Sequence, residues 1–179
     1  RRRGRDGWSR ARTSQSQEPK ASHTHANDDS GSGGARASLN ATMSTALSDI
    51  VPVLESIAPL RYAEDWDNVG LLVEPSRDGH AVHRVLLTID LGEDVLEEAA
   101  ERGAELVIAY HPPIFSGLDR LTQANAGERV VVAALRGGIA VYSPHTALDA
   151  APGGVNDWLA DALGPGERAP LVPASDGAP

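Results

Sequence analysis

The chain has 179 residues, of which 41% are hydrophobic, and a formal net charge of −9. It contains no cysteine, which excludes disulfides, thiolate nucleophiles and sulfur-rich metal sites, so any metal would need nitrogen and oxygen ligands. No apolar run approaches the roughly 18 residues of a membrane span, and we expect a cytoplasmic protein that does not contact a membrane.

Charge and composition divide the chain into three parts. Residues 1–42 carry eight Lys and Arg against four Asp and Glu and have few large apolar residues, so we expect a disordered basic extension rich in Arg, Ser and Gly. A nucleic-acid-binding arm is the functional alternative for this segment, and we favour a solvated tail. The rest of the chain carries eight basic residues against twenty-one acidic ones. Within it, residues 43–164 have the patterns of a folded domain, whereas residues 165–179, rich in Pro, Gly and Ala, indicate a second disordered tail.

The folded part opens with a helical pattern and an acidic segment. Apolar residues at helical spacing predict a helix that Ser48 caps and that Ala58-Pro59 ends. A segment with a tryptophan between two aspartates, residues 63–68, then precedes a short predicted strand over residues 69–73. We expect Trp66 to be a buried anchor rather than a surface for stacking a substrate, with the neighbouring aspartates holding the backbone beside it.

Apolar runs and helical patterns alternate through the remainder of the domain. Strands are predicted over residues 82–89, 106–109 and 139–142, and helices over residues 93–102, 127–136 and 155–163. Short connections between successive strand and helix patterns imply crossover connections and parallel strands. The sequence therefore predicts an α/β fold with a mostly parallel sheet and helices on both faces.

Several polar residues follow the predicted parallel strands directly. They are Asp90 after the first strand, Tyr110 and His111 after the second, and Ser143, His145 and Asp149 after the third. Because the carboxyl ends of parallel strands share one rim of a sheet, we expect these residues to meet there. Two imidazoles and two carboxylates are suitable ligands for zinc, manganese or iron.

Each of these residues also has a structural interpretation. Asp90 could cap the following helix, and His111 alone could be a hydrogen-bonded structural histidine. Proline at 144 and the run Ala-Pro-Gly-Gly at 151–154 favour a loop around His145 and Asp149. In such a loop, Asp149 could cap a turn.

Three separated motifs resemble the NGG-interacting-factor-three family, also labelled GTP cyclohydrolase I type 2-like. They are Ala-Glu-Asp-Trp-Asp-Asn-Val-Gly-Leu-Leu-Val at 63–73, His-Pro-Pro-Ile-Phe at 111–115, and the segment 142–157 with its His-Thr-Ala-Leu-Asp. The resemblance covers about residues 44–164. It implies the N-terminal portion of a two-domain α/β protein that forms a ring-shaped homohexamer with two divalent metal ions per subunit. It also implies metal-dependent hydrolysis of a nucleotide or another phosphorylated small molecule.

The resemblance further implies roles for single residues. His111 and Asp149 match metal ligands, and His145 matches a histidine beside the metal site. Tyr110 stands where the family has its first histidine, and it is a possible ligand or a neighbour of one. The family's distal His and Glu ligands have no counterpart after Gly164, so we expect a truncated domain that binds a divalent metal weakly. The alternative to an impaired hydrolase is a non-catalytic binding or assembly module, or a truncated product of such a gene.

Overall fold

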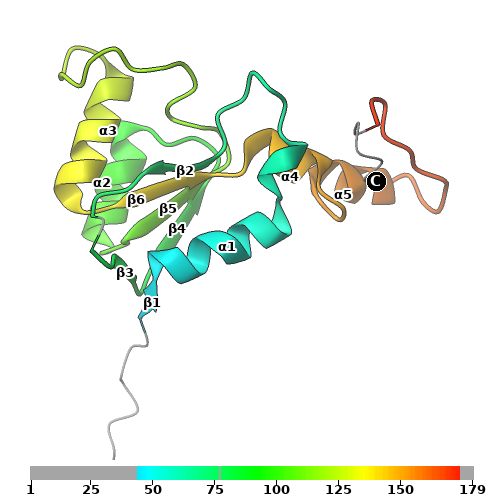
Figure 1. The fold of residues 1–179 in the computed structure, drawn as a ribbon, viewed down its shortest axis with the longest axis horizontal. Coiled ribbons are helices and arrows are strands. Elements are labelled where there is room, and N and C mark those ends of the chain that lie inside the picture. Colours follow the sequence, from blue (N-terminus) through cyan, green and yellow to red (C-terminus); the bar gives the residue numbers. More distant parts are fainter. Residues whose placement is uncertain (1–43, 77, 174–179) are drawn as a thin grey trace, which may run out of the picture. The chain divides into compact units, whose positions relative to one another are not determined.

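The computed structural model describes residues 44–76 and 78–173 (Figure 1). The predicted basic extension, residues 1–42, and the last six residues of the chain lie outside this part. Residues 165–173, the described share of the predicted C-terminal tail, contain no helix or strand. The elements in chain order are β1 (Thr45–Ala46), α1 (Leu47–Ile57), the 3-10 helix η1 (Leu60–Tyr62), β2 (Gly70–Val73), β3 (Ala81–Val82), β4 (Val85–Thr88), α2 (Glu93–Glu101), β5 (Leu106–Ala109), α3 (Ala126–Gly137), β6 (Ala140–Ser143), α4 (His145–Ala150) and α5 (Val155–Asp161).

A four-stranded sheet in the order β2-β6-β5-β4 forms the centre of the fold. Strands β4, β5 and β6 are parallel, with Val107 of β5 level with Leu86 of β4 and Val141 of β6, whereas β2 runs antiparallel to β6. Crossover helices α2 and α3 connect the parallel strands, as the alternation of patterns predicts. The prediction of a mostly parallel α/β sheet is therefore confirmed.

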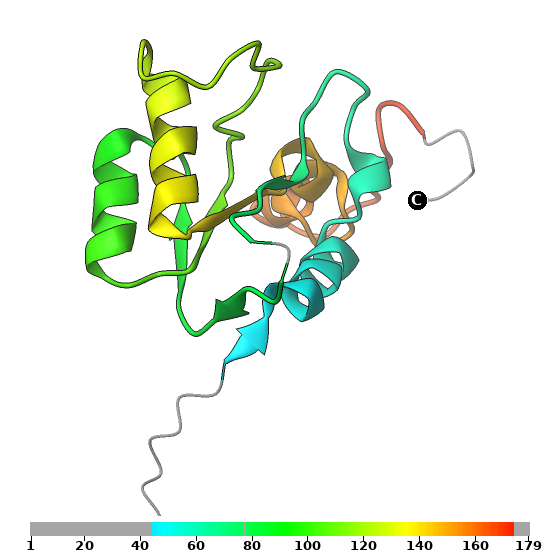
Figure 2. The ribbon, with the colours of Figure 1, turned by 60° about the vertical axis from the view of Figure 1, so that its left-hand side comes forward.

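Helices cover the two faces of this sheet differently. The buried faces of α2 and α3 contribute to one core cluster, which includes Leu96, Ala99, Val130, Val131 and Ala134. Helix α1 packs on the opposite face, where Leu47 of this helix joins Leu106 and Tyr142 of the sheet in a second cluster. Figure 2 shows α2 and α3 side by side, away from α1. None of the helices within the described segments is long and apolar enough to cross a membrane.

The predicted strand over residues 82–89 is in fact two strands. Its first part, β3, pairs with β1 in a separate two-stranded sheet, and β4 joins the central sheet. Between them, the backbone N–H groups of His83 and Arg84 donate to the carboxylate of Glu105. These two donors are thus paired with a side chain and not with a neighbouring strand, which explains the break.

Local capping signals vary in how well they predict the helix ends. Helix α3 begins after Asn125, whose side chain accepts a hydrogen bond from the N–H of Glu128, and ends at Gly138 in the left-handed conformation with φ of 66°. The prediction that Gly137-Gly138 ends this helix is confirmed. The prediction that Ser48 caps α1 is wrong, because α1 begins at Leu47 and its N-cap is Ala46.

Candidate functional site

The residues that follow the parallel strands meet at one rim of the sheet, as the topology predicts. Asp90, after β4, has its Oδ1 atom 2.7 Å from Nδ1 of His111, after β5. The hydroxyl of Ser143, at the end of β6, donates to the backbone carbonyl oxygen of Tyr110 over 2.9 Å. Three consecutive strand ends are therefore linked by hydrogen bonds at this rim.

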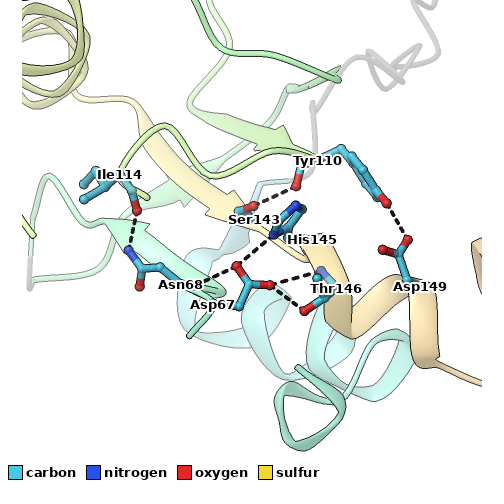
Figure 3. A network of polar contacts seen from close by, with 8 residues as sticks. All are labelled: Asp67, Asn68, Tyr110, Ile114, Ser143, His145, Thr146 and Asp149. Carbon is cyan, nitrogen blue, oxygen red and sulfur yellow. Dashed lines mark hydrogen bonds and ion pairs between the residues drawn. The ribbon is translucent and has the colours of Figure 1, made fainter. Parts of the chain in front are cut away.

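Tyr110 connects His111 to Asp149. Its hydroxyl donates to Oδ1 of Asp149 (Figure 3), and its ring centroid lies 5.0 Å from that of His111. Burial, the hydrogen bond to Asp149 and the negative charges of Asp149 and Asp67 raise the pKa of Tyr110 to about 12. The phenol therefore keeps its proton at neutral pH and acts as a hydrogen-bond donor to Asp149.

Asp90 orients the imidazole of His111. An ionised carboxylate can only accept hydrogen bonds, so the Nδ1 atom facing Asp90 carries the proton and the Nε2 lone pair is left for another partner. A carboxylate on one ring nitrogen is the usual arrangement for a histidine that binds a metal through the other. The alternative that Asp90 caps the next helix is wrong, because the N-cap of α2 is Gly92.

His145 is held by Asp67, a residue from the loop before β2. Oδ1 of Asp67 lies 2.8 Å from Nδ1 of His145, and its side chain is 0% exposed. The other carboxylate oxygen accepts from the backbone N–H and the hydroxyl of Thr146, and Oδ1 also accepts from the N–H of Asn68 (Figure 3). Burial by itself raises the pKa of Asp67, but the hydrogen bonds from Thr146, His145 and Asn68 outweigh burial and lower it.

His145 and Asp149 lie on a short helix, α4, and not in a loop. The loop prediction is wrong because the prolines and glycines flank the helix: Pro144 is its N-cap, and the Pro-Gly-Gly run at 152–154 follows it. Proline cannot offer a side-chain oxygen to the first turn. The carboxylate of Asp67 takes that place by accepting the N–H of Thr146 over 3.2 Å.

Trp66 is exposed, so the prediction of a buried anchor is wrong. The residue is 59% exposed, and its ring centroid lies 6.0 Å from that of Phe115. The aspartates beside Trp66 differ: Asp67 does hold the adjacent backbone, through the N–H of Asn68, whereas Asp65 is exposed.

The donors at the rim fit part of a divalent-metal site. His111 offers a neutral imidazole nitrogen and Asp149 a carboxylate oxygen, both suited to zinc, manganese or iron. Among residues 44–76 and 78–173, no group of three or more His, Cys, Asp or Glu is placed to hold a metal ion. The described residues thus suit a pair of ligands and do not complete a coordination shell.

The motifs that surround this rim also identify the family. The sequence model of Duf34/NIF3 (NGG1p interacting factor 3) matches residues 45–178. The chain belongs to the Duf34/NIF3 family. The resemblance seen in the three sequence motifs is therefore confirmed.

Relatives and a solved structure extend this Duf34/NIF3 assignment. NIF3-like protein 1 of Drosophila melanogaster is 51% identical over 135 residues, which are 75% of this chain and 46% of that protein. NGG1-interacting factor 3 of Saccharomyces cerevisiae is 41% identical, over 68% of this chain and 45% of that protein. The crystal structure of a Bacillus cereus protein related to NIF3 matches with a TM-score of 0.64 and 35% sequence identity. The match covers 73% of this chain and 35% of the Bacillus cereus chain. This chain spans less than half the length of each of these three Duf34/NIF3 proteins.

Sequence reasoning missed the part that Asp67 and Phe115 play. Asp67 meets His145 across 78 residues of chain, and Phe115 lies 6.3 Å from His145 between ring centroids. Both residues lie within the motifs at 63–73 and 111–115, which is the signal that could have placed them at the site. No local spacing rule connects those motifs to α4.

Proposed function

We propose that the chain supplies His111 and Asp149 as ligands of a divalent metal ion, zinc, manganese or iron, in a metal-dependent hydrolase. The observation that carries the proposal is that Tyr110 neighbours both residues at one rim of the sheet. Its ring lies 5.0 Å from the ring of His111, which Asp90 orients through Nδ1, and its hydroxyl donates to Asp149. A bound divalent ion would lower the pKa of a water molecule toward 7. Tyr110 and Asp90 hold the two ligands in place. His145 lies beside them, either next to the metal ligands or as a further ligand.

We propose a nucleotide or another phosphorylated small molecule as the substrate. Residues 43–179 carry eight Lys and Arg against twenty-one Asp and Glu, so an anionic substrate is repelled unless a cation lies between it and the protein. The resemblance of the three sequence motifs to this family implies the same substrate class, and with it a homohexameric assembly. A cytoplasmic location stays a prediction.

A second candidate function is a non-catalytic binding or assembly module. Tyr110 in place of a histidine favours it, since a phenol with a pKa of about 12 is a poor metal ligand at neutral pH. The yeast relative is named NGG1-interacting factor 3, which refers to an interaction of that protein with a partner. In the first candidate function a metal ion bound at the rim takes part in hydrolysis, whereas in the second candidate function no reaction depends on it.

Calorimetric titration with zinc and with manganese tests the ligand assignment. We expect at most one weakly bound ion per chain, and loss of this binding in the His111→Ala and Asp149→Ala variants. Tyr110→His should tighten binding by about tenfold, or about 1.4 kcal/mol, because it adds an imidazole and releases the carboxylate of Asp149. His83→Ala is the matched control, since His83 pairs with Glu105 and lies before β4, at the other end of the strands.

Two results would contradict the proposal. Unchanged metal binding in both His111→Ala and Asp149→Ala would show that these residues are not ligands. A tight site for two ions in the unaltered chain would show that this chain supplies a complete set of metal ligands.

A further inference from the structure

Three aromatic rings from separate segments face one another beside the rim. They belong to Trp66 in the loop before β2, Phe115 in the loop after β5, and His145 at the start of α4. The centroid of Trp66 lies 6.0 Å from that of Phe115 and 6.4 Å from that of His145, and the Phe115 to His145 distance is 6.3 Å. We call these three residues the ring triangle.

The ring triangle is not part of a core. Trp66 is 59% exposed and Phe115 is 53% exposed, although tryptophan and phenylalanine are among the side chains that gain most from burial. The planes of Trp66 and Phe115 meet at 53°, so neither ring covers the face of the other. Aromatic faces are therefore left open to a ligand at this place.

His145 links the ring triangle to the proposed metal ligands. Its centroid lies 5.6 Å from that of His111 and 5.8 Å from that of Tyr110. Asp67 fixes His145 through Nδ1, so the ring common to both groups is held in one orientation. A ligand stacked on Trp66 or Phe115 would thus have its other end within reach of the rim.

We propose that the ring triangle binds the planar ring of a nitrogen heterocycle, such as the base of a nucleoside. A neutral planar ring suits this place better than an anion, because the domain is strongly acidic and Glu64 and Asp65 directly precede Trp66. Apolar faces beside a few oriented polar groups are the usual composition of a small-molecule site. The inference rests on the proposed function only for the phosphate end of the ligand, which would point toward His111 and Asp149.

Titration of the whole chain with guanosine and adenosine in the presence of a chelator tests the stacking alone. Changes in tryptophan fluorescence and in the indole N–H resonances report the contact. We expect saturable binding of both nucleosides and none of ribose 5-phosphate, which lacks the ring. Trp66→Ala should weaken nucleoside binding by about tenfold and Trp66→Phe by about threefold, since base stacking on an aromatic side chain tolerates a change of aromatic ring.

Matched variants separate this inference from the metal proposal. Trp158→Ala removes another exposed tryptophan, in α5 and outside the ring triangle, and should leave nucleoside binding unchanged. Because the titration is made in the presence of a chelator, failure of the metal site does not affect this result.

Three outcomes would overturn the inference. The first is no saturable signal up to the solubility limit of the nucleosides, and the second is equal affinity in the unaltered chain and in Trp66→Ala. The third is a Trp66 signal that depends on protein concentration alone, which would show that a second copy of the chain covers the rings.

Discussion

The carboxylate of Asp67 shows how one residue can organise a site made of distant segments. With its side chain 0% exposed, it accepts hydrogen bonds from His145, from the N–H and hydroxyl of Thr146, and from the N–H of Asn68. It thereby fixes which nitrogen of His145 carries the proton and also caps the helix on which Asp149 lies. Hydrogen bonds to a buried charged group are among the stronger ones in proteins.

Asp67→Asn should lower the free energy of unfolding at pH 7 by about 2 kcal/mol, because the amide has one acceptor oxygen where the carboxylate has two. It should also release His145 from the tautomer protonated at Nδ1. Urea unfolding measures the first effect, and imidazole ¹⁵N chemical shifts measure the second. Asp65→Asn, at the exposed neighbouring aspartate, is the control and should change stability by less than about 0.5 kcal/mol.

The effect of Asp67→Asn on the free energy of unfolding should depend on pH, and the sign of this dependence follows from the lowered pKa of Asp67. Folding lowers this pKa below its ordinary value of 3.8, so the stabilisation is fully present above that value and is lost as the pH falls through the folded-state pKa. The difference in unfolding free energy between the unaltered chain and Asp67→Asn should therefore shrink below about pH 4. A difference that stays constant into acid would contradict an ionised, hydrogen-bonded Asp67.

At the scale of elements, what the sequence predicts depends on whether the signal is local. Strand β5 and helices α2 and α3 lie within a residue of their predicted limits, because apolar periodicity and the glycines at 137–138 act within a few residues of each element. For helix α4 the flanking Pro144 and the run at 151–154 predict a loop, and its six residues are too few to show a periodic pattern that would oppose them. The carboxylate that caps α4 also comes from Asp67, which is 79 residues away from Thr146 in the chain. A local sequence pattern cannot reveal a contact over that separation. The rim was predictable from strand order, but the contacts of Asp67, Trp66 and Phe115 were not.

The junction between α4 and α5 has a steric requirement at Gly154. A Cβ atom there would lie 2.0 Å from the backbone oxygen of Leu148 and 2.7 Å from that of Ala151, and backbone atoms of a helix end cannot move aside easily. Gly154→Ala should therefore lower the free energy of unfolding by about 3 kcal/mol and shift α4, which carries His145 and Asp149.

Gly153→Ala is the natural comparison. Gly153 has φ of 73°, but no atom lies within 4 Å of an added Cβ. Alanine there is disfavoured only by the left-handed backbone conformation, so Gly153→Ala should lower the free energy of unfolding by about 1 kcal/mol. Thermal unfolding followed by circular dichroism compares the two variants. Equal losses of stability would show that the close approach at Gly154 does not constrain the junction.

At the scale of the whole molecule, the edge of the sheet at β4 has an uncovered apolar stripe. Val85 and Leu87 of this strand, and Ile89 directly after it, alternate with less exposed residues, and Leu87 is 73% exposed. The partners of Val85 and Leu87 on β5, which are Leu106 and Ile108, belong to the cluster under α1, so the stripe continues that face of the sheet beyond the helix. An exposed apolar strand at a sheet edge is a site of association.

We expect the chain to self-associate through this stripe, and its charge makes the association depend on salt. Copies with a large excess of acidic residues repel one another at low ionic strength, and added salt screens the repulsion without weakening apolar contact. Light scattering should therefore show a mean mass that rises with protein concentration and more steeply in about 0.5 M than in about 0.02 M salt.

Leu87→Lys should return the chain to a monomer, because a charge on an edge strand opposes pairing. Leu163→Lys adds the same charge at an exposed leucine that follows α5, so it separates loss of the stripe from the change in net charge. A monomer at every concentration and salt level, or equal dissociation in both lysine variants, would show that the stripe does not bind a second copy.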